Sequence, residues 1–202
     1  MTVRRLPAVL LAAAVAAGAL AGCGSESWEK KCSTNAAGVI ECAPDQRLPV
    51  GAVTGDLLDG GAYDVAKDRG KVVVVNFWGS WCNPCRAEAD DLEGTYQATK
   101  AKDVTFVGVN SLDDRDSAKA FERGFGVTYP SIYDRNGSVA LKFDVTQVST
   151  PATLVLDRQG RIAAGIRRAT TAAELRPLVE RIAAEDRPTA PPPTGGQSEG
   201  PP

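Results

Sequence analysis

A continuous run of apolar, mostly β-branched residues, KVVVVNFW at residues 71–78, constrains the fold of this chain most strongly. A run without polar alternation is typical of a strand that is buried on both faces of a sheet. The following residues predict a helix from about Pro84 to Lys100, because a proline is tolerated in the first helical turn and apolar residues recur there at helical spacing. A buried strand followed directly by a helix indicates an α/β fold.

The rest of the central part continues this alternation. We expect a second buried strand at residues 104–109, a helix at 113–123 that ends at Gly124, and a short helix near 138–143. A strand at 152–156 and a second strand that ends at about residue 166 form a predicted hairpin.

A last helix is expected to open with the capping box of Thr171 and Glu174, and Pro177 predicts a kink or a later start. The order β-α-β-α-β-β-α implies a parallel pair joined by a crossover, followed by an antiparallel hairpin.

This alternation spans residues 48–185, which we predict to be one domain. Residues 24–49 are polar and are expected to be irregular. Residues 186–202 are rich in proline and glycine and carry no large apolar side chain, so we expect this tail to be disordered.

The chain contains no histidine. Catalytic Ser-His-Asp and Cys-His pairs are therefore excluded, as are His-ligated zinc, copper and haem sites. A formal net charge of −2 gives no electrostatic reason to expect a nucleic-acid partner. The chemistry must rely on cysteines, carboxylates, lysine, tyrosine or backbone dipoles.

The motif WCNPC at residues 81–85 lies between the buried strand and its helix. A helix N-terminus stabilises negative charge, and the thiolate is the nucleophile in disulfide exchange. We expect Cys82, at the exposed start of the helix, to attack a partner disulfide and Cys85 to resolve the mixed disulfide. No metal and no cofactor beyond a Cys82–Cys85 disulfide is expected, because Arg86 stands where a c-type haem site needs histidine.

Near the N-terminus, two arginines precede an apolar stretch at residues 6–20, which is shorter than the roughly 20 residues of a membrane-spanning helix. The stretch ends in LAGC at residues 20–23, which resembles the lipobox of bacterial lipoproteins. The resemblance implies that residues 1–22 are a signal peptide and that Cys23 carries acyl chains that anchor the protein to the outer face of the cell membrane. The alternative is an ordinary signal peptide with an incidental cysteine.

The five cysteines fit this interpretation. With Cys23 assigned to lipid, the remaining four form two pairs, Cys32 with Cys42 and Cys82 with Cys85. Residues 23–47 would then be a lipidated segment stapled by a structural disulfide that contributes roughly 3 kcal/mol. A second redox relay at Cys32 and Cys42 is the alternative.

Residues 73–88, VVVNFWGSWCNPCRAE, resemble the active-site stretch of TlpA/ResA-like thioredoxins, and the pattern can be followed over residues 48–184. The resemblance implies a thioredoxin fold with three α/β/α layers, a central mixed sheet and a central insertion at residues 111–143. It also implies an extracytoplasmic thiol-disulfide oxidoreductase.

The family pattern assigns further site residues. Thr150-Pro151 is expected to be a cis-proline that faces the cysteines, with the preceding backbone holding an incoming peptide like an added strand. Trp81, Asn83 and Pro84 complete the expected substrate groove.

Glu88 matches an acidic residue of ResA-like proteins and is a candidate catalytic group, although it can also be a solvated helix residue. Asn76 stands where thioredoxin has a buried aspartate that accepts a proton. Proton transfer at Cys85 must therefore use Glu88, water or another group.

Members of this family are usually reductants that keep the haem-binding cysteines of apocytochrome c reduced, and some actinobacterial relatives oxidise secreted proteins instead. The dipeptide Asn83-Pro84 lacks the histidine of strongly oxidising sites, which favours a reductase. The expected partners are protein or peptide thiols and disulfides, apocytochrome c among them, and a membrane thiol donor or acceptor. An oxidase or isomerase, a peroxiredoxin and a non-catalytic binding lipoprotein are the alternatives.

Overall fold

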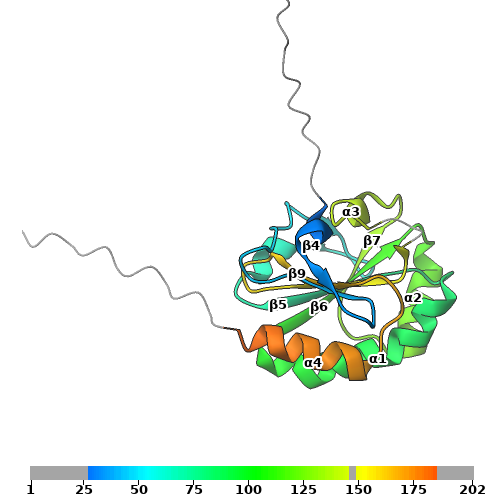
Figure 1. Ribbon diagram of the computed structural model, residues 1–202. Coiled ribbons are helices and arrows are strands. Elements are labelled where there is room, and N and C mark those ends of the chain that lie inside the picture. The colour runs from blue at the N-terminus through cyan, green and yellow to red at the C-terminus, as the bar shows by residue number, and fades with distance from the viewer. Residues whose placement is uncertain (1–26, 146–148, 186–202) are drawn as a thin grey trace, which may run out of the picture.

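The computed structural model describes residues 27–145 and 149–185 (Figure 1). The signal peptide predicted at residues 1–22, the lipidation predicted at Cys23 and the tail predicted to be disordered at 186–202 lie outside the described residues. Within the described ranges, no helix combines the length and apolarity needed to cross a membrane.

A seven-stranded mixed sheet forms the centre, in the order β1-β2-β9-β8-β5-β6-β7. Strands β5, β6 and β7 run parallel, and each of the other neighbours pairs antiparallel. A separate two-stranded sheet joins β3 and β4. The strands are β1 (Ser33–Thr34), β2 (Val39–Glu41), β3 (Thr54–Asp56), β4 (Ala62–Asp64), β5 (Val72–Trp78), β6 (Val104–Ser111), β7 (Ser131–Asp134), β8 (Ala152–Leu156) and β9 (Ile162–Ile166).

The apolar run at residues 71–78 forms β5 from Val72 onward, and all seven residues of this strand are buried. Its side chains alternate between two cores, which explains why no polar alternation is visible in the sequence. Val72 and Val74 belong to one apolar cluster with Leu92 of helix α1, whereas Val73 and Val75 belong to a second cluster on the opposite face.

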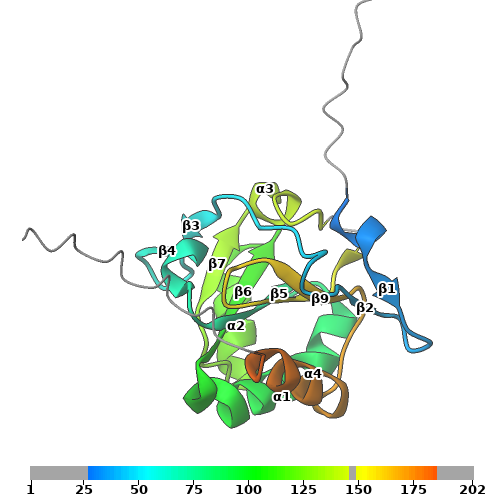
Figure 2. The same ribbon diagram turned by 60° about the vertical axis from the view of Figure 1, so that its left-hand side comes forward.

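The helices are α1 (Asn83–Thr99), α2 (Arg115–Phe125), α3 (Ser138–Leu141) and α4 (Ala172–Ala183). Figures 1 and 2 show α1 and α4 side by side on one face of the sheet, with the short α3 on the other face. The described residues also contain the 3-10 helices η1 (Trp28–Lys31), η2 (Val65–Asp68) and η3 (Lys100–Lys102). The arrangement is a thioredoxin-like α/β fold with a central mixed sheet flanked by helices.

The N-terminal segment is more regular than its polar composition suggested. Strand β2 pairs with β9, so this segment extends the sheet instead of forming an irregular arm. Buried Val39 and Ile40 supply the apolar contacts, and the guanidinium of buried Arg47 donates hydrogen bonds to Asp157 and Glu185. The expectation of an irregular segment is wrong because the adjacent apolar residues Val39 and Ile40 are buried, and β2 pairs with β9 on one side and with β1 on the other.

Helix α2 begins and ends two residues later than expected. Asp114 is its N-cap, with a carboxylate that accepts hydrogen bonds from the N–H groups of Asp116 and Ser117. Gly126, not Gly124, ends the helix, because it adopts the left-handed conformation (φ 62°) that a glycine accepts without strain. Strand β7, in the region expected to be an insertion, was not predicted from the sequence.

The capping box predicted for α4 does not form. The Thr171 side chain makes no capping hydrogen bond, and Glu174 pairs with Arg168 instead. The N–H group of Ala172, the first helical residue, is instead satisfied from α1, where the Asp91 carboxylate accepts its hydrogen bond at 3.0 Å. The helix runs through Pro177 from Ala172, so the later start expected from this proline is also wrong.

Candidate functional site

Cys82 and Cys85 are joined by a disulfide at the N-terminus of α1, with an S–S distance of 2.07 Å. Cys82 is the N-cap residue, and its Sγ accepts a hydrogen bond from Cys85 N at 3.2 Å. This is the position where free N–H groups and the helix dipole stabilise a negative charge. A thiolate formed at Cys82 on reduction would gain both stabilising effects.

Both cysteines are buried in the disulfide form. Cys82 is only 3% exposed and Cys85 is 2% exposed, so the expectation of an exposed Cys82 is wrong. They belong to an apolar cluster with Trp78 of β5 and Phe121 of α2. This cluster exists because α2 packs beside the start of α1, and the sequence pattern does not indicate that contact. The residues next to Cys82 in the motif, Trp81 and Asn83, are exposed.

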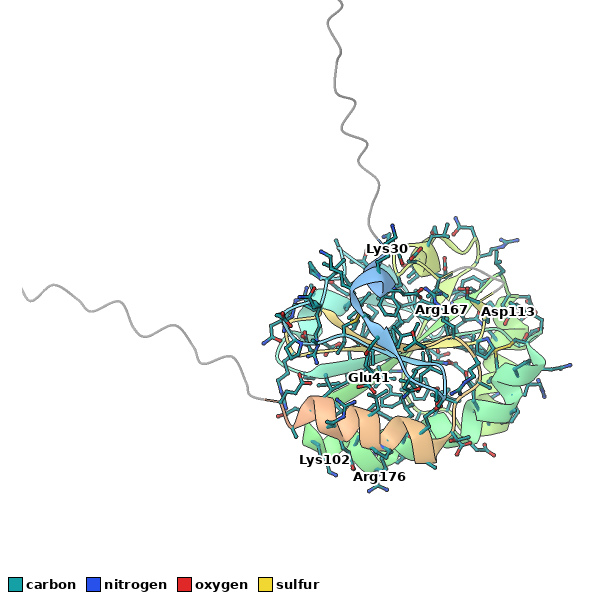
Figure 3. The ribbon with its side chains drawn as sticks, in the orientation of Figure 1. Lys30, Glu41, Lys102, Asp113, Arg167 and Arg176 are labelled. Atoms are coloured by element: carbon teal, nitrogen blue, oxygen red, sulfur yellow. A yellow bond between two sulfur atoms is a disulfide. The ribbon has the colours of Figure 1, made fainter. Side chains whose placement is uncertain are left out.

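Asp113 holds the loop that leads into the cysteines, and the sequence analysis missed this role. The residue lies in the loop between β6 and α2 (Figure 3). Its carboxylate accepts hydrogen bonds from Ser80 N at 2.6 Å and from Ser80 Oγ at 2.7 Å. Asn110 Nδ2 donates a third, at 2.8 Å. The pattern of acidic residues suggested only a first helical turn, because nothing in a sequence indicates a contact across 33 positions.

Trp81 is held by two contacts although the residue is 43% exposed. Its indole N–H donates a hydrogen bond to the Ser111 carbonyl oxygen at 3.2 Å. The ring lies so close to Gly79 that a Cβ at this position would approach Trp81 Nε1 to 2.4 Å. The loop before Cys82 is therefore anchored at Ser80 and at Trp81 on the segment that follows β6.

Glu88 lies one turn after Cys85 on α1 and is 1% exposed, so the alternative of a solvated carboxylate is wrong. The Asn76 side-chain amide donates a hydrogen bond to one oxygen at 2.9 Å, and Thr170 N donates one to the other at 2.9 Å. Burial raises the pKa of Glu88 to about 7, against the lowering effect of the two hydrogen bonds. A carboxyl group with this pKa gains and loses a proton readily near neutral pH.

Asn76 connects β5, α1 and β8. Besides Glu88, its amide donates to Thr153 Oγ1 at 3.2 Å. Asn76 and Cys85 also line one small cavity of about 10 Å³. This is close to the lower limit for a single water, roughly 10–15 Å³. The space connects the inner cysteine to the residue that holds the Glu88 carboxylate.

The peptide bond between Thr150 and Pro151 is cis. Pro151 directly precedes β8, whose first residue, Ala152, pairs with Phe77 near the carboxyl end of β5. The cis-proline is thus placed at the edge of the sheet from which the cysteine loop leaves. Pro84 is exposed beside the disulfide, and Thr150 is half-buried.

Cys32 and Cys42 form a second disulfide, with a Cα–Cα distance of 4.3 Å. Cys42 belongs to the apolar cluster that contains Val73 and Val75, which differs from the cluster around Cys82. The two disulfides therefore occupy separate cores of the described structure.

The sequence profile of the Redoxin family matches residues 43–177, which is more than half of the chain. The thiol-disulfide oxidoreductase ResA of Geobacillus kaustophilus is 32% identical over 105 residues, which cover 52% of this chain and 59% of that protein. ResA of Bacillus subtilis is 29% identical over 104 residues, which cover 52% of this chain and 57% of that protein. The chain thus spans less than two thirds of the length of these two relatives.

Solved structures cover more of the chain. A secreted thiol-disulfide isomerase from Corynebacterium glutamicum is 32% identical, with a TM-score of 0.70 over 73% of this chain and 92% of that one. A DsbF homologue from Corynebacterium diphtheriae is 36% identical, with a TM-score of 0.67 over 71% of this chain and 92% of that one. A secreted disulfide oxidoreductase from Mycobacterium tuberculosis, homologous to DsbE of E. coli, is 28% identical with a TM-score of 0.56 over 65% of this chain and 94% of that one.

Proposed function

The chain belongs to the Redoxin family as a thioredoxin-like thiol-disulfide oxidoreductase, and from this premise we propose that it is an extracytoplasmic reductase of protein disulfides. The observation that carries the proposal is the Cys82–Cys85 disulfide at the start of α1, with the buried Glu88 carboxyl one turn behind it.

The proposed reaction begins with both cysteines reduced. The Cys82 thiolate attacks one sulfur of a substrate disulfide, which forms a mixed disulfide and releases the first substrate thiolate. The Cys85 thiolate then attacks the Cys82 sulfur, which restores the Cys82–Cys85 bond and releases the second substrate thiolate. Two electrons pass from the protein to the substrate, and a thiol donor at the membrane must return them.

Glu88 is the proposed proton acceptor for Cys85. Residues three positions apart on a helix share a face, so the carboxyl group lies on the same side of α1 as the inner cysteine. Asn76 cannot accept the proton as an aspartate would, but its amide holds the carboxylate that can. A water in the small cavity lined by Cys85 and Asn76 would carry the proton from Cys85 toward Glu88.

The surroundings of the sulfurs support reduction over oxidation. An apolar cluster disfavours a thiolate, and a nearby carboxylate disfavours it further, whereas the N-terminus of α1 favours it. We propose that the apolar surroundings and the carboxyl group together outweigh the helix terminus, whose effect is about 2 kcal/mol at most. A less stable thiolate makes the reduced form a better electron donor.

The proposal extends to the substrate class and to the place of the enzyme in the cell. Apocytochrome c, whose haem-binding cysteines must stay reduced, is the proposed substrate class. The lipid on Cys23 would place the enzyme at the outer face of the membrane, next to its thiol donor. Radioactive palmitate labelling tests this placement, because Cys23→Ser should abolish the label.

An oxidase or isomerase of secreted proteins is the second candidate. It is favoured by the 32% identical Corynebacterium glutamicum structure, which is described as a secreted thiol-disulfide isomerase. An oxidase differs from the proposed reductase in the direction of electron transfer, and an isomerase transfers no net electrons to its substrate.

The experiment that tests the proposal mixes the reduced protein with a peptide that contains an oxidised Cys-X-X-Cys-His sequence. We expect stoichiometric reduction of the peptide by the wild type and none by Cys82→Ser. If the reduced wild type leaves the peptide oxidised, but the disulfide form oxidises or rearranges the thiols and disulfides of an unfolded protein, the second candidate would be established instead.

A further inference from the structure

Three large apolar side chains are exposed in the part of the chain that the structure describes, and all three lie together. They are Trp81, Leu112 and Leu141, which are 43%, 40% and 62% exposed. All three line one groove of about 130 Å³ that also reaches Thr150. Apolar residues scattered singly over a surface need no explanation, but a cluster in a hollow indicates a binding site.

The groove adjoins the redox site through two of its lining residues. Trp81 directly precedes Cys82, and Thr150 directly precedes the cis-proline. None of the described residues that line the groove carries a charge. A charged group placed there would lose hydration without gaining an ion pair, so the lining selects an apolar occupant.

The walls of the groove are held in place by a buried carboxylate. Asp134 is 2% exposed and accepts hydrogen bonds from Val139 N at 3.0 Å and Ala140 N at 2.9 Å, which fixes the start of α3. It also accepts a hydrogen bond from Ser111 Oγ at 3.2 Å. One residue thus joins the helix that carries Leu141 to the loop that carries Leu112.

Leu112 itself has an unusual backbone. Its φ of 53° lies in the left-handed region, which a leucine adopts only at a cost. The Leu112 N–H donates a hydrogen bond to the Asp134 carbonyl oxygen at 3.1 Å, which holds this conformation. The strained backbone keeps an apolar side chain at the surface, beside Trp81, where it gains little from burial.

We infer that the groove of Trp81, Leu112 and Leu141 is a subsite for one apolar side chain of the substrate segment that carries the reacting cysteine. The inference rests on the proposed function, because it assigns a specificity to the same site. A volume of 130 Å³ suits a leucine, methionine or phenylalanine side chain, since an apolar cavity of about 150 Å³ holds a benzene-sized group.

The test compares disulfide peptides in which each position flanking the cysteines carries either leucine or serine. For the wild type, we expect leucine at one position to raise kcat/KM by about tenfold, the discrimination typical of a small apolar pocket. Leu141→Ser and Leu112→Asn should reduce this preference to about twofold. Asparagine tolerates the left-handed backbone, so the second variant keeps the loop. Lys142→Ser, which changes the exposed residue next to Leu141, is the matched control and should keep the preference.

Two further measurements separate this inference from the proposed function. Reduction of hydroxyethyl disulfide, which is too small and polar to need the groove, should be equal in all variants. Binding of the leucine peptide with serine in place of its cysteines should shift the Trp81 indole resonance in NMR, whatever the redox activity. Equal kcat/KM values for leucine and serine at every position would overturn the subsite, as would an unchanged preference in both groove variants. If the wild type reduces no disulfide, an unmoved Trp81 resonance overturns the subsite and a shifted one supports it.

Discussion

The side-chain amide of Asn76 and the carboxylate of Glu88 are joined by a hydrogen bond of 2.9 Å beneath the redox disulfide. The contact links the central strand β5 to the helix α1 that carries both cysteines. Thr170 N holds the other carboxylate oxygen, so three elements position this single acid. In the proposed mechanism this carboxylate accepts the proton of Cys85.

Glu88→Gln should remove a pH dependence from the resolving step. In the wild type, the rate of mixed-disulfide resolution should rise with pH through about 7, as Glu88 ionises and can accept the Cys85 proton. Glutamine does not titrate, so this rise should disappear. Asp91→Asn, which removes a nearby carboxylate that caps α4, is the control; it should keep the rise, moved to lower pH because Asp91 raises the pKa of Glu88. Stopped-flow kinetics from pH 5 to 9 provides the measurement.

The same pKa predicts how stability changes with pH. The folded protein holds the Glu88 proton up to about pH 7, whereas the unfolded chain releases it near 4.5. Between these values the folded state binds more protons, so the free energy of unfolding should fall as the pH rises, by about 3 kcal/mol in total. Urea titrations at pH 5 and pH 8 should show this fall in the wild type. An equal fall in Glu88→Gln would assign it to another group.

How far the sequence predicts this protein depends on the range of the interactions. Strand β5, helix α1 and the cysteine pair depend on local pattern and were predicted closely. The partners of Glu88 lie 12 and 82 positions away, and Ser80 lies 33 positions from Asp113, so no periodicity indicates these contacts. For the same reason the sequence predicts that Thr171 caps α4, whereas the carboxylate of Asp91 accepts the hydrogen bond of Ala172 N from the neighbouring helix α1.

Cys85→Ser should accumulate a mixed disulfide through Cys82, because the first attack can proceed and resolution cannot. Cys82→Ser should accumulate none, since it removes the thiol at the N-cap of α1 and leaves only Cys85 inside the first turn. Pro151→Thr, which changes the residue after the cis peptide bond, should prolong the mixed disulfide in an otherwise wild-type protein. Non-reducing gels and mass mapping of the linked peptides provide the measurement. Mixed disulfides linked through Cys85 would show that Cys85 attacks the substrate and Cys82 resolves, which is the reverse of the proposed roles.

Asp113→Ala should reduce disulfide reduction by at least about tenfold, because the loop before Cys82 would lose its hydrogen bonds to Ser80 and catalytic geometry is sensitive to displacements of about 1 Å. Asp114→Ala removes the neighbouring carboxylate, which caps α2, and serves as the control. We expect it to cost about 1 kcal/mol of stability with little effect on activity. Comparable activity losses in the two variants would show that Asp113 acts only through stability.

Replacing both Cys32 and Cys42 with serine should lower the free energy of unfolding by about 3 kcal/mol, the value expected for closing a loop of this length. Reduction of substrate should be unchanged at temperatures where the variant is folded, because this disulfide lies in a different core. Thiol labelling during turnover provides a second check. Labelling of Cys32 or Cys42 that depends on substrate would indicate an electron relay.

The reduction potential of the Cys82–Cys85 couple tests the proposed function most directly. Wild-type protein equilibrated in glutathione and dithiothreitol buffers, then quenched and alkylated, gives the fraction reduced at each potential. The account predicts a value more negative than about −200 mV, on the side of thioredoxin at about −270 mV. A value near −120 mV, as for the oxidant DsbA, would contradict the proposed reductase and show that the site takes electrons from its substrates.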